Sequence, residues 1–155
     1  MEREIFRRII IEGQELLGNI ELFERPFFFE ERGNYVFVGI RQSGKSYLLY
    51  QRIQQLVKAG HSIEEIIYVN FDDERIKSVR IADLDLILQA YASMFDFKPI
   101  IFLDEIQNID SWANFARRLV NQKYRVYITG SNAKMLSRDI ATTLGGRFFC
   151  QNVSP

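Results

Sequence analysis

The chain has 155 residues, 47% of them hydrophobic and 26% charged, which is enough for one domain with a single core. Twenty basic and twenty acidic residues cancel, so the overall charge indicates neither a nucleic-acid-binding nor a membrane-surface protein. The single cysteine, Cys150, cannot form an internal disulfide, and the amino terminus resembles neither a signal peptide nor a membrane span. We therefore expect a cytoplasmic domain without membrane association.

The first 34 residues form the least regular part of the chain. Their amino-terminal half carries apolar residues at helical spacing, which predicts a short helix. The "PFFF" run at residues 26–29 suits an extended segment that lies over a sheet or over a ligand. The apolar residues of the expected helix are Ile5, Phe6, Ile9 and Ile10.

From residue 35 onward, short apolar runs alternate with helical patterns, which is typical of βαβ units and a parallel sheet. Thirteen phenylalanines predict an aromatic core or interface. Strands are expected at residues 35–38, 65–71, 100–103, 125–129 and 147–153. Helices are expected from the glycine-rich turn to Gly60, over 84–95, over 112–120 behind a cap at Asp110 or Ser111, and over 133–144.

The stretch "GIRQSGKS" matches the phosphate-loop pattern G-x-x-x-x-G-K-[ST] and lies between an expected strand and an expected helix. Glycines let such a loop turn its amide N–H groups toward a phosphate, and the positive end of the next helix adds to them. Lys45 is then expected to reach the β- and γ-phosphates, and the Ser46 hydroxyl to bind Mg²⁺. The alternative is a glycine-rich turn with an exposed lysine, which the strand and helix on either side disfavour. The nucleotide contacts are expected from Gly39, Arg41, Gln42, Ser43, Gly44, Lys45, Ser46 and Tyr47.

A second pattern, "IIFLDE", ends an apolar strand in two carboxylates. Open parallel sheets bind their ligands at the carboxyl ends of the strands, where these two acids are expected to lie. Asp104 is expected to hold Mg²⁺, and Glu105 to take a proton from an attacking water. An acidic pair after a strand is, by itself, more often a solvated loop. The phosphate loop earlier in the chain favours the catalytic interpretation.

The phosphate loop, "IIFLDE" and "YITGSNA" resemble, in this order, the Walker A, Walker B and sensor 1 motifs of the AAA+ class of P-loop ATPases. Longer stretches over about residues 35–150 are similar to bacterial and archaeal AAA+ ATPases whose core precedes a lid and a further domain of poorly defined role. The resemblance implies an α/β, three-layer α-β-α P-loop NTPase fold with a five-stranded, mostly parallel sheet in the order 5-1-4-3-2. Residues 35–155 are then the ATPase core, and residues 1–34 a helix and extended segment packed on it.

The resemblance also implies three further roles. Asn132, or else Ser131, is expected to contact the γ-phosphate or the attacking water as sensor 1. Asn70 matches the position that restrains the catalytic glutamate, although an asparagine that caps the next turn fits nearly as well. Arg147 matches an arginine finger that acts in trans within a homo-oligomer, with Arg138 as the fallback and a surface arginine as the alternative.

The lid that closes over the adenine in this class has no counterpart in the chain, which is either a truncated piece or a short gene product. Adenine contacts are therefore sought in the first thirty residues, at Ile9, Ile10 or Phe28. Without a lid and a neighbouring subunit, we expect ATP binding to persist while turnover becomes slow.

The leading interpretation is a Mg²⁺-dependent ATPase, with ATP and Mg²⁺ as cofactors, that drives a conformational change in itself or in an attached or partner domain. One alternative is a nucleotide-dependent switch that does not hydrolyse ATP. A P-loop small-molecule kinase is a weaker alternative, because the chain shows no arginine-rich lid and no second-substrate pocket. The sequence leaves open whether the cycle serves DNA, protein remodelling or defence.

Overall fold

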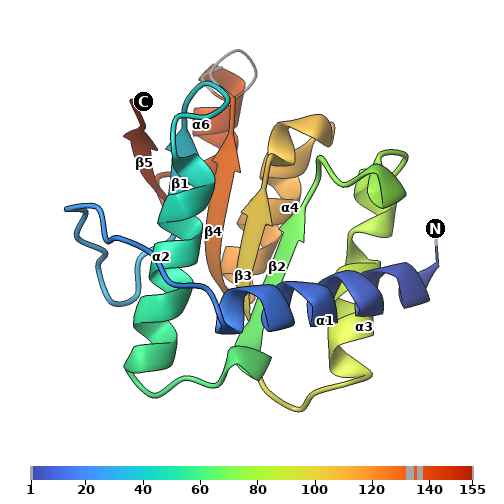
Figure 1. Cartoon of the computed structure of the whole chain (residues 1–155). Helices are drawn as coiled ribbons and strands as arrows, with labels where there is room; N and C mark the ends of the chain where they lie inside the picture. Colours follow the sequence, from blue (N-terminus) through green and yellow to red (C-terminus); the bar gives the residue numbers. More distant parts are fainter. Residues whose placement is uncertain (1, 132–134, 136–137, 155) are drawn as a thin grey trace.

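Five parallel strands form one sheet at the centre of the molecule (Figure 1). The structure, a computed structural model, describes residues 2–131, 135 and 138–154. Its strand order, β2-β3-β4-β1-β5, is the predicted 5-1-4-3-2 read from the other edge. The sheet is all-parallel, where a mostly parallel one was expected. The strands are β1 (Tyr35–Val38), β2 (Ile66–Asn70), β3 (Ile100–Asp104), β4 (Arg125–Gly130) and β5 (Phe149–Asn152).

Helices cover both faces of this sheet. In Figure 1, α2 lies in front of the strands, and α4 and α6 lie behind them. Each face has its own cluster of buried side chains, one with α2 and the other with α3, α4 and α6. This arrangement is the predicted three-layer α-β-α fold. The helices are α1 (Arg3–Gly18), α2 (Lys45–Lys58), α3 (Asp85–Ala92), α4 (Trp112–Asn121) and α6 (Arg138–Leu144).

The alternation of side chains along each strand decides which of them faces α2. On β3, Ile101 and Leu103 join the α4 side of the core, whereas Ile100 and Phe102 join the α2 side. Aromatic rings dominate the α2 side, where the Tyr127 ring stacks on the Phe102 ring with their centroids 4.6 Å apart. The predicted aromatic core is therefore confirmed on this face.

Helix α1 is longer than the short helix that the sequence predicts, and it covers the edge strand β2. The Gln14 side-chain amide donates a hydrogen bond to the Ile66 carbonyl oxygen at 3.0 Å. A Cβ atom added at Gly13 would lie 3.3 Å from the Tyr68 carbonyl oxygen, so the helix backbone comes close to the strand. Ile9 and Ile10 are buried in the core, and their side chains are therefore not available to an adenine base.

The extended segment after α1 packs on the α2 side of the sheet. Phe29 is buried, and the Phe27 ring lies 5.4 Å from that of Phe37, centroid to centroid. Phe28 points out and is largely exposed. The segment before residue 35 therefore contributes to the same core as the strands.

Two local predictions are corrected by the structure. Ser111 stands at the N-cap position of α4, but its backbone is left-handed (φ 63°) and its side chain makes no capping hydrogen bond. Helix α3 ends at Ala92, so Met94 and Phe95, which were expected within the helix, follow it and still pack against the core. In the described part of the chain, no helix has the length and apolar character to cross a bilayer.

Candidate functional site

The predicted phosphate loop joins the carboxyl end of β1 to the first turn of α2, at the upper edge of the sheet in Figure 1. The Gly39 N–H donates to the Gly130 carbonyl oxygen at 3.1 Å, which ties the start of the loop to β4. A Cβ atom at Gly39 would lie 2.7 Å from both the Ser43 hydroxyl and the Val153 carbonyl oxygen, so only glycine fits. Gln42 and Gly44 have φ angles of 63° and 96°, and these left-handed residues turn the chain back into α2.

Lys45 is the first residue of α2, and its ammonium lies inside the loop. Its side chain is only 3% exposed. The Nζ atom donates to the Gly39 carbonyl oxygen at 2.9 Å and forms an ion pair with Glu105 Oε1 at 3.0 Å. The loop lysine and the second acid of "IIFLDE" therefore meet directly.

Asp104 ends β3 on the same face of the sheet as α2. Its carboxylate has no exposed surface and accepts hydrogen bonds from the Tyr68 and Thr129 hydroxyls. Burial raises the pKa of Asp104, and hydrogen bonds from Thr129, Tyr68 and Ser46 oppose that shift. Ser46, on the first turn of α2, lies close enough to Asp104 to lower its pKa, so the two predicted Mg²⁺ ligands lie together.

Glu105 follows the strand in a left-handed conformation (φ 57°), which turns its side chain toward the loop. Its backbone N–H donates to Thr129 Oγ1 at 3.0 Å. Its Oε1 pairs with Lys45, and its Oε2 accepts a hydrogen bond from Gln107 Nε2 at 2.8 Å. Non-glycine residues seldom adopt this backbone conformation, and such residues are enriched at functional sites.

The residues present fit a magnesium ion that is shared with a bound phosphate. Among the described residues, no group of three or more histidine, cysteine, aspartate or glutamate side chains could hold a metal by itself. Mg²⁺ keeps several waters and takes one or two protein ligands plus substrate phosphates, and Ser46 and Asp104 suit that mode. The Ser43 hydroxyl is buried and has no hydrogen-bond partner within the described part of the chain, which fits a polar ligand at the loop.

A family model described as an AAA domain matches residues 31–155. The chain belongs to this AAA domain family. It is 33% identical to an uncharacterized protein of Methanocaldococcus jannaschii over 97% of the chain and 33% of that protein. It is 36% identical to an uncharacterized protein of Haemophilus influenzae over 73% of the chain and 29% of that protein. The chain thus spans about a third of the length of these relatives.

The fold of this AAA domain is shared with a solved structure, AMPPCP-bound DnaA from Aquifex aeolicus. The TM-score is 0.51 at 16% identity, and the match covers 94% of this chain and 44% of the DnaA chain. At that identity the match shows the fold alone, which is the AAA-type P-loop NTPase fold.

The other residues that were expected to contact nucleotide lie on the rim of the loop. Arg41 is exposed, with its guanidinium 3.3 Å from the Asp72 carboxylate. Gln42 is also exposed. Tyr47 is exposed on the first turn of α2, and its ring lies edge-on to Tyr50 with centroids 5.6 Å apart.

The residues expected in the three further roles differ in where they lie in the AAA domain. Asn70 lies at the same sheet edge as Asp104, but its side-chain oxygen accepts from the Asp72 N–H at 2.9 Å and so caps a turn. Arg147 is exposed before β5. Because Phe149 pairs with Tyr35 at the start of β1, Arg147 lies at the opposite end of the sheet from the loop. Asn132 lies outside the described residues, as does the side chain of Arg138.

Sequence reasoning missed Tyr68, Thr129 and Gln107. Tyr68 and Thr129 reach Asp104 because all three side chains point to one face of neighbouring parallel strands. That relation follows from the register, which pairs Asn70 with Asp104 and Leu103 with Ile128. Once the strand order is known, the positions of Tyr68 and Thr129 beside Asp104 can be predicted from the sequence. For Gln107, the only indication in the sequence is its position two residues after Glu105.

A groove of about 360 Å³ lies beside the loop, between the segment before β1 and the end of β5 with the residues that follow it. The Arg25 guanidinium on its wall donates to the Ser43 carbonyl oxygen at 3.3 Å. The groove is lined by Arg25, Pro26, Phe27, Leu48 and residues 151–154.

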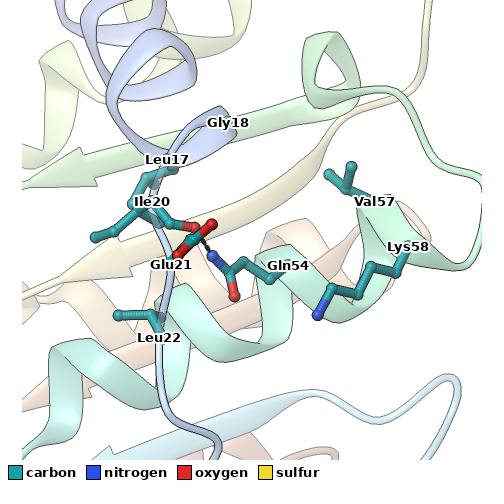
Figure 2. A pocket seen from close by; sticks show the side chains of 8 residues that line it. All are labelled: Leu17, Gly18, Ile20, Glu21, Leu22, Gln54, Val57 and Lys58. Carbon is teal, nitrogen blue, oxygen red and sulfur yellow. Dashed lines mark hydrogen bonds between the residues drawn. The ribbon is translucent and has the colours of Figure 1, made fainter.

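A second groove, of about 410 Å³, lies between the end of α1 and the last turns of α2 (Figure 2). The Gln54 side-chain amide donates to the Ile20 carbonyl oxygen across it. Because Gln54, Val57 and Lys58 belong to the far end of α2, this groove is separate from the phosphate loop.

Proposed function

We propose that this AAA domain binds ATP with Mg²⁺ in the phosphate loop and hydrolyses it, with Glu105 as the general base. The ion pair between Lys45 Nζ and Glu105 Oε1, at 3.0 Å and almost fully buried, carries this proposal. It joins a phosphate-binding ammonium to a carboxylate at one point of the sheet edge. A chain that only held nucleotide would need the lysine there, but not the acid.

Binding uses the start of α2. Its first N–H groups lack partners within the helix and provide donors for the phosphates, with Lys45 as a buried positive charge. Ser46 and Asp104 would hold Mg²⁺, which supplies positive charge to the β- and γ-phosphates when it is bound. The groove beside Arg25, Phe27 and Leu48 is the proposed base site, in place of the one expected at Ile9 and Ile10.

Hydrolysis uses the carboxylate that Lys45 holds. A bound triphosphate competes with Glu105 for the Lys45 ammonium, and its arrival frees Glu105 Oε1 to accept a proton. The attacking water forms a bond to the γ-phosphorus, the bond to the bridging oxygen breaks, and ADP leaves. The proton from the water passes to Glu105.

The test is phosphate release by the purified chain with Mg²⁺-ATP, together with ATP affinity measured by titration calorimetry. Glu105→Gln keeps the size of the side chain and is expected to lower turnover by about 100-fold or more, with little change in affinity. Lys45→Ala is expected to weaken ATP binding by roughly 100-fold, because it removes a buried charge that contacts phosphate.

The outcomes also separate the alternatives. ATP binding without phosphate release in the unmodified chain would support the non-hydrolysing switch. Release that requires an added acceptor would support the kinase. Unchanged ATP affinity in Lys45→Ala would contradict the proposed site itself.

A further inference from the structure

Gln107 connects the Glu105 carboxylate to the end of β4. It lies in a short 3₁₀ turn, Ile106–Asn108, and is 9% exposed. Its Nε2 donates to Glu105 Oε2 at 2.8 Å, and its Oε1 accepts from the Ser131 N–H at 3.2 Å. An ionised carboxylate can only accept and a backbone N–H can only donate, so these two partners fix the orientation of the amide.

The two oxygens of Glu105 have partners of different kinds. Oε1 contacts Lys45, a charged side chain that a phosphate attracts. Oε2 contacts Gln107, a neutral amide with no such competitor for its hydrogen bond. When Lys45 turns toward phosphate, Gln107 still holds Oε2, and the freed Oε1 keeps its direction.

The backbone of Glu105 is joined to β4 as well. Its N–H donates to Thr129 Oγ1, and the Thr129 hydroxyl in turn donates to Asp104. Through Thr129 and Ser131, the end of β4 therefore determines the position of both the main chain and the side chain of Glu105.

We propose that Gln107 is the positioning residue for Glu105 and couples it to the end of β4. This inference rests on the proposed hydrolysis and gives Gln107 the contact with the glutamate that was expected of Asn70. Asn70 instead uses its side-chain oxygen on the Asp72 N–H. A displacement of Ser131, directly after β4, then reaches Glu105 through the Gln107 side chain.

The direct test is the kinetics of two variants of similar size. Gln107→Met removes both hydrogen bonds, and Gln107→Glu keeps an acceptor for Ser131 but cannot donate to ionised Glu105. Both are expected to lower kcat by roughly 10- to 100-fold, while the affinity for a non-hydrolysable ATP analogue stays within about twofold. Wild-type kcat in both variants would overturn the proposal.

Gln14→Met is the matched control. Like Gln107, Gln14 is a buried glutamine, and its Nε2 donates a hydrogen bond to the Ile66 carbonyl oxygen. Unlike Gln107, it lies at the β2 edge of the sheet and outside the site. It is expected to lower Tm about as much as Gln107→Met and to leave kcat unchanged. A matching fall of kcat in Gln14→Met would show that lost stability, rather than lost positioning, explains the effect.

A second readout does not depend on turnover. The side-chain amide of Gln107 is identified in an ¹⁵N–¹H spectrum as the signal that Gln107→Met lacks. Glu105→Ala is expected to shift this signal, whereas Mg²⁺ with the non-hydrolysable analogue is expected to leave it hydrogen-bonded. If the unmodified chain releases no phosphate, the proposed hydrolysis fails. An unmoved Gln107 signal in Glu105→Ala overturns the positioning role separately.

Discussion

Asp104 is a carboxylate that is buried completely within the site. A carboxylate without exposed surface loses its hydration, and burial accordingly raises its pKa. The Tyr68 and Thr129 hydroxyls compensate in part by donating hydrogen bonds to the charge. We therefore expect Asp104 to lower the free energy of unfolding while it serves as a metal ligand, as functional residues often do.

Asp104→Asn is therefore expected to stabilise the chain while it weakens Mg²⁺-dependent ATP binding. Asparagine has the same shape and no charge, and the two hydroxyls can reverse their roles toward it. We expect a gain of about 1 kcal/mol at neutral pH, which is roughly 2–4 °C in Tm for a chain of this size. A lower Tm would show that the charge is fully compensated where it lies.

The stability gained by Asp104→Asn is expected to depend on pH. Because the pKa of Asp104 is raised in the folded chain, the folded state binds more protons than the unfolded state between the ordinary and the raised pKa. The free energy of unfolding of the unmodified chain therefore falls as pH rises through this window, and the loss is complete above it. The advantage of Asp104→Asn should shrink as pH falls through the same window, as urea unfolding at several pH values can measure.

Gly44 and Gly60 form a matched pair of left-handed glycines, with φ angles of 96° and 112°. Alanine at either position is expected to destabilise the chain by about 1 kcal/mol through backbone strain. Only Gly44→Ala should also weaken ATP binding, because a Cβ atom there meets the Arg25 guanidinium beside the loop. A Cβ atom at Gly60 meets nothing within 4 Å. Equal affinities in the two variants would contradict the assignment of the loop.

Among single residues, the sequence predicts the roles of those that belong to a short contiguous motif. Lys45, Asp104 and Glu105 stand in two contiguous patterns, and the structure brings the three together. Gln107 and Thr129 act through contacts between separate strands and turns, which no local pattern encodes. For Asn70 the sequence left two roles open, and its side-chain oxygen makes the turn-capping contact of the second.

Among the elements, α1 contributes several buried side chains to the core although it precedes the sheet. Phe6 is fully buried and belongs to the core on the α4 side of the sheet. Leu16, on the same helix, is 63% exposed. Helix α1 is thus part of the domain core, although the AAA domain family model matches the chain only from residue 31.

Phe6→Ala is expected to cost about 3–5 kcal/mol in the free energy of unfolding, and Leu16→Ala less than about 1 kcal/mol. Urea unfolding of the two variants measures the difference. Similar values for both would mean that α1 contributes little beyond its own helical propensity.

The strands were predictable because apolar runs flanked by turns leave few alternatives. Tyr35–Val38 is predicted to the residue, and the other four strands within three residues at each end. The length of α1 was not predictable, because its second half mixes charged residues with Gln14, which is buried by its bond to β2. Asp110 or Ser111 was predicted to cap α4, but Ser111, at the N-cap position, has a left-handed backbone and makes no side-chain capping hydrogen bond.

For the whole molecule, Arg147 raises the question of a second copy. It precedes β5 at the end of the sheet that is remote from the loop, so it lies away from the loop of its own chain. If Arg147 acts in trans, Arg147→Ala chains keep a complete site and Glu105→Gln chains keep the arginine. A mixture of the two is then expected to release phosphate faster than either variant alone.

That mixing experiment needs sizing by light scattering with and without Mg²⁺-ATP as its control. An assembly that forms with nucleotide, together with recovered activity in the mixture, supports the role in trans. A chain that stays monomeric while it turns over ATP at an unchanged rate in Arg147→Ala would contradict it.

The two faces of the sheet also differ in their optical properties. The chain has one tryptophan, Trp112, buried on the α4 side, whereas the stacked Tyr35 and Tyr127 rings lie on the α2 side. Tryptophan fluorescence therefore reports on the α4 side, and the near-ultraviolet dichroism of the stacked tyrosines reports on the α2 side, with a further tyrosine signal from Tyr91 on the α4 side. Since both layers share the same strands, we expect their melting curves to coincide. Separate curves would mean that one layer can loosen while the other stays intact.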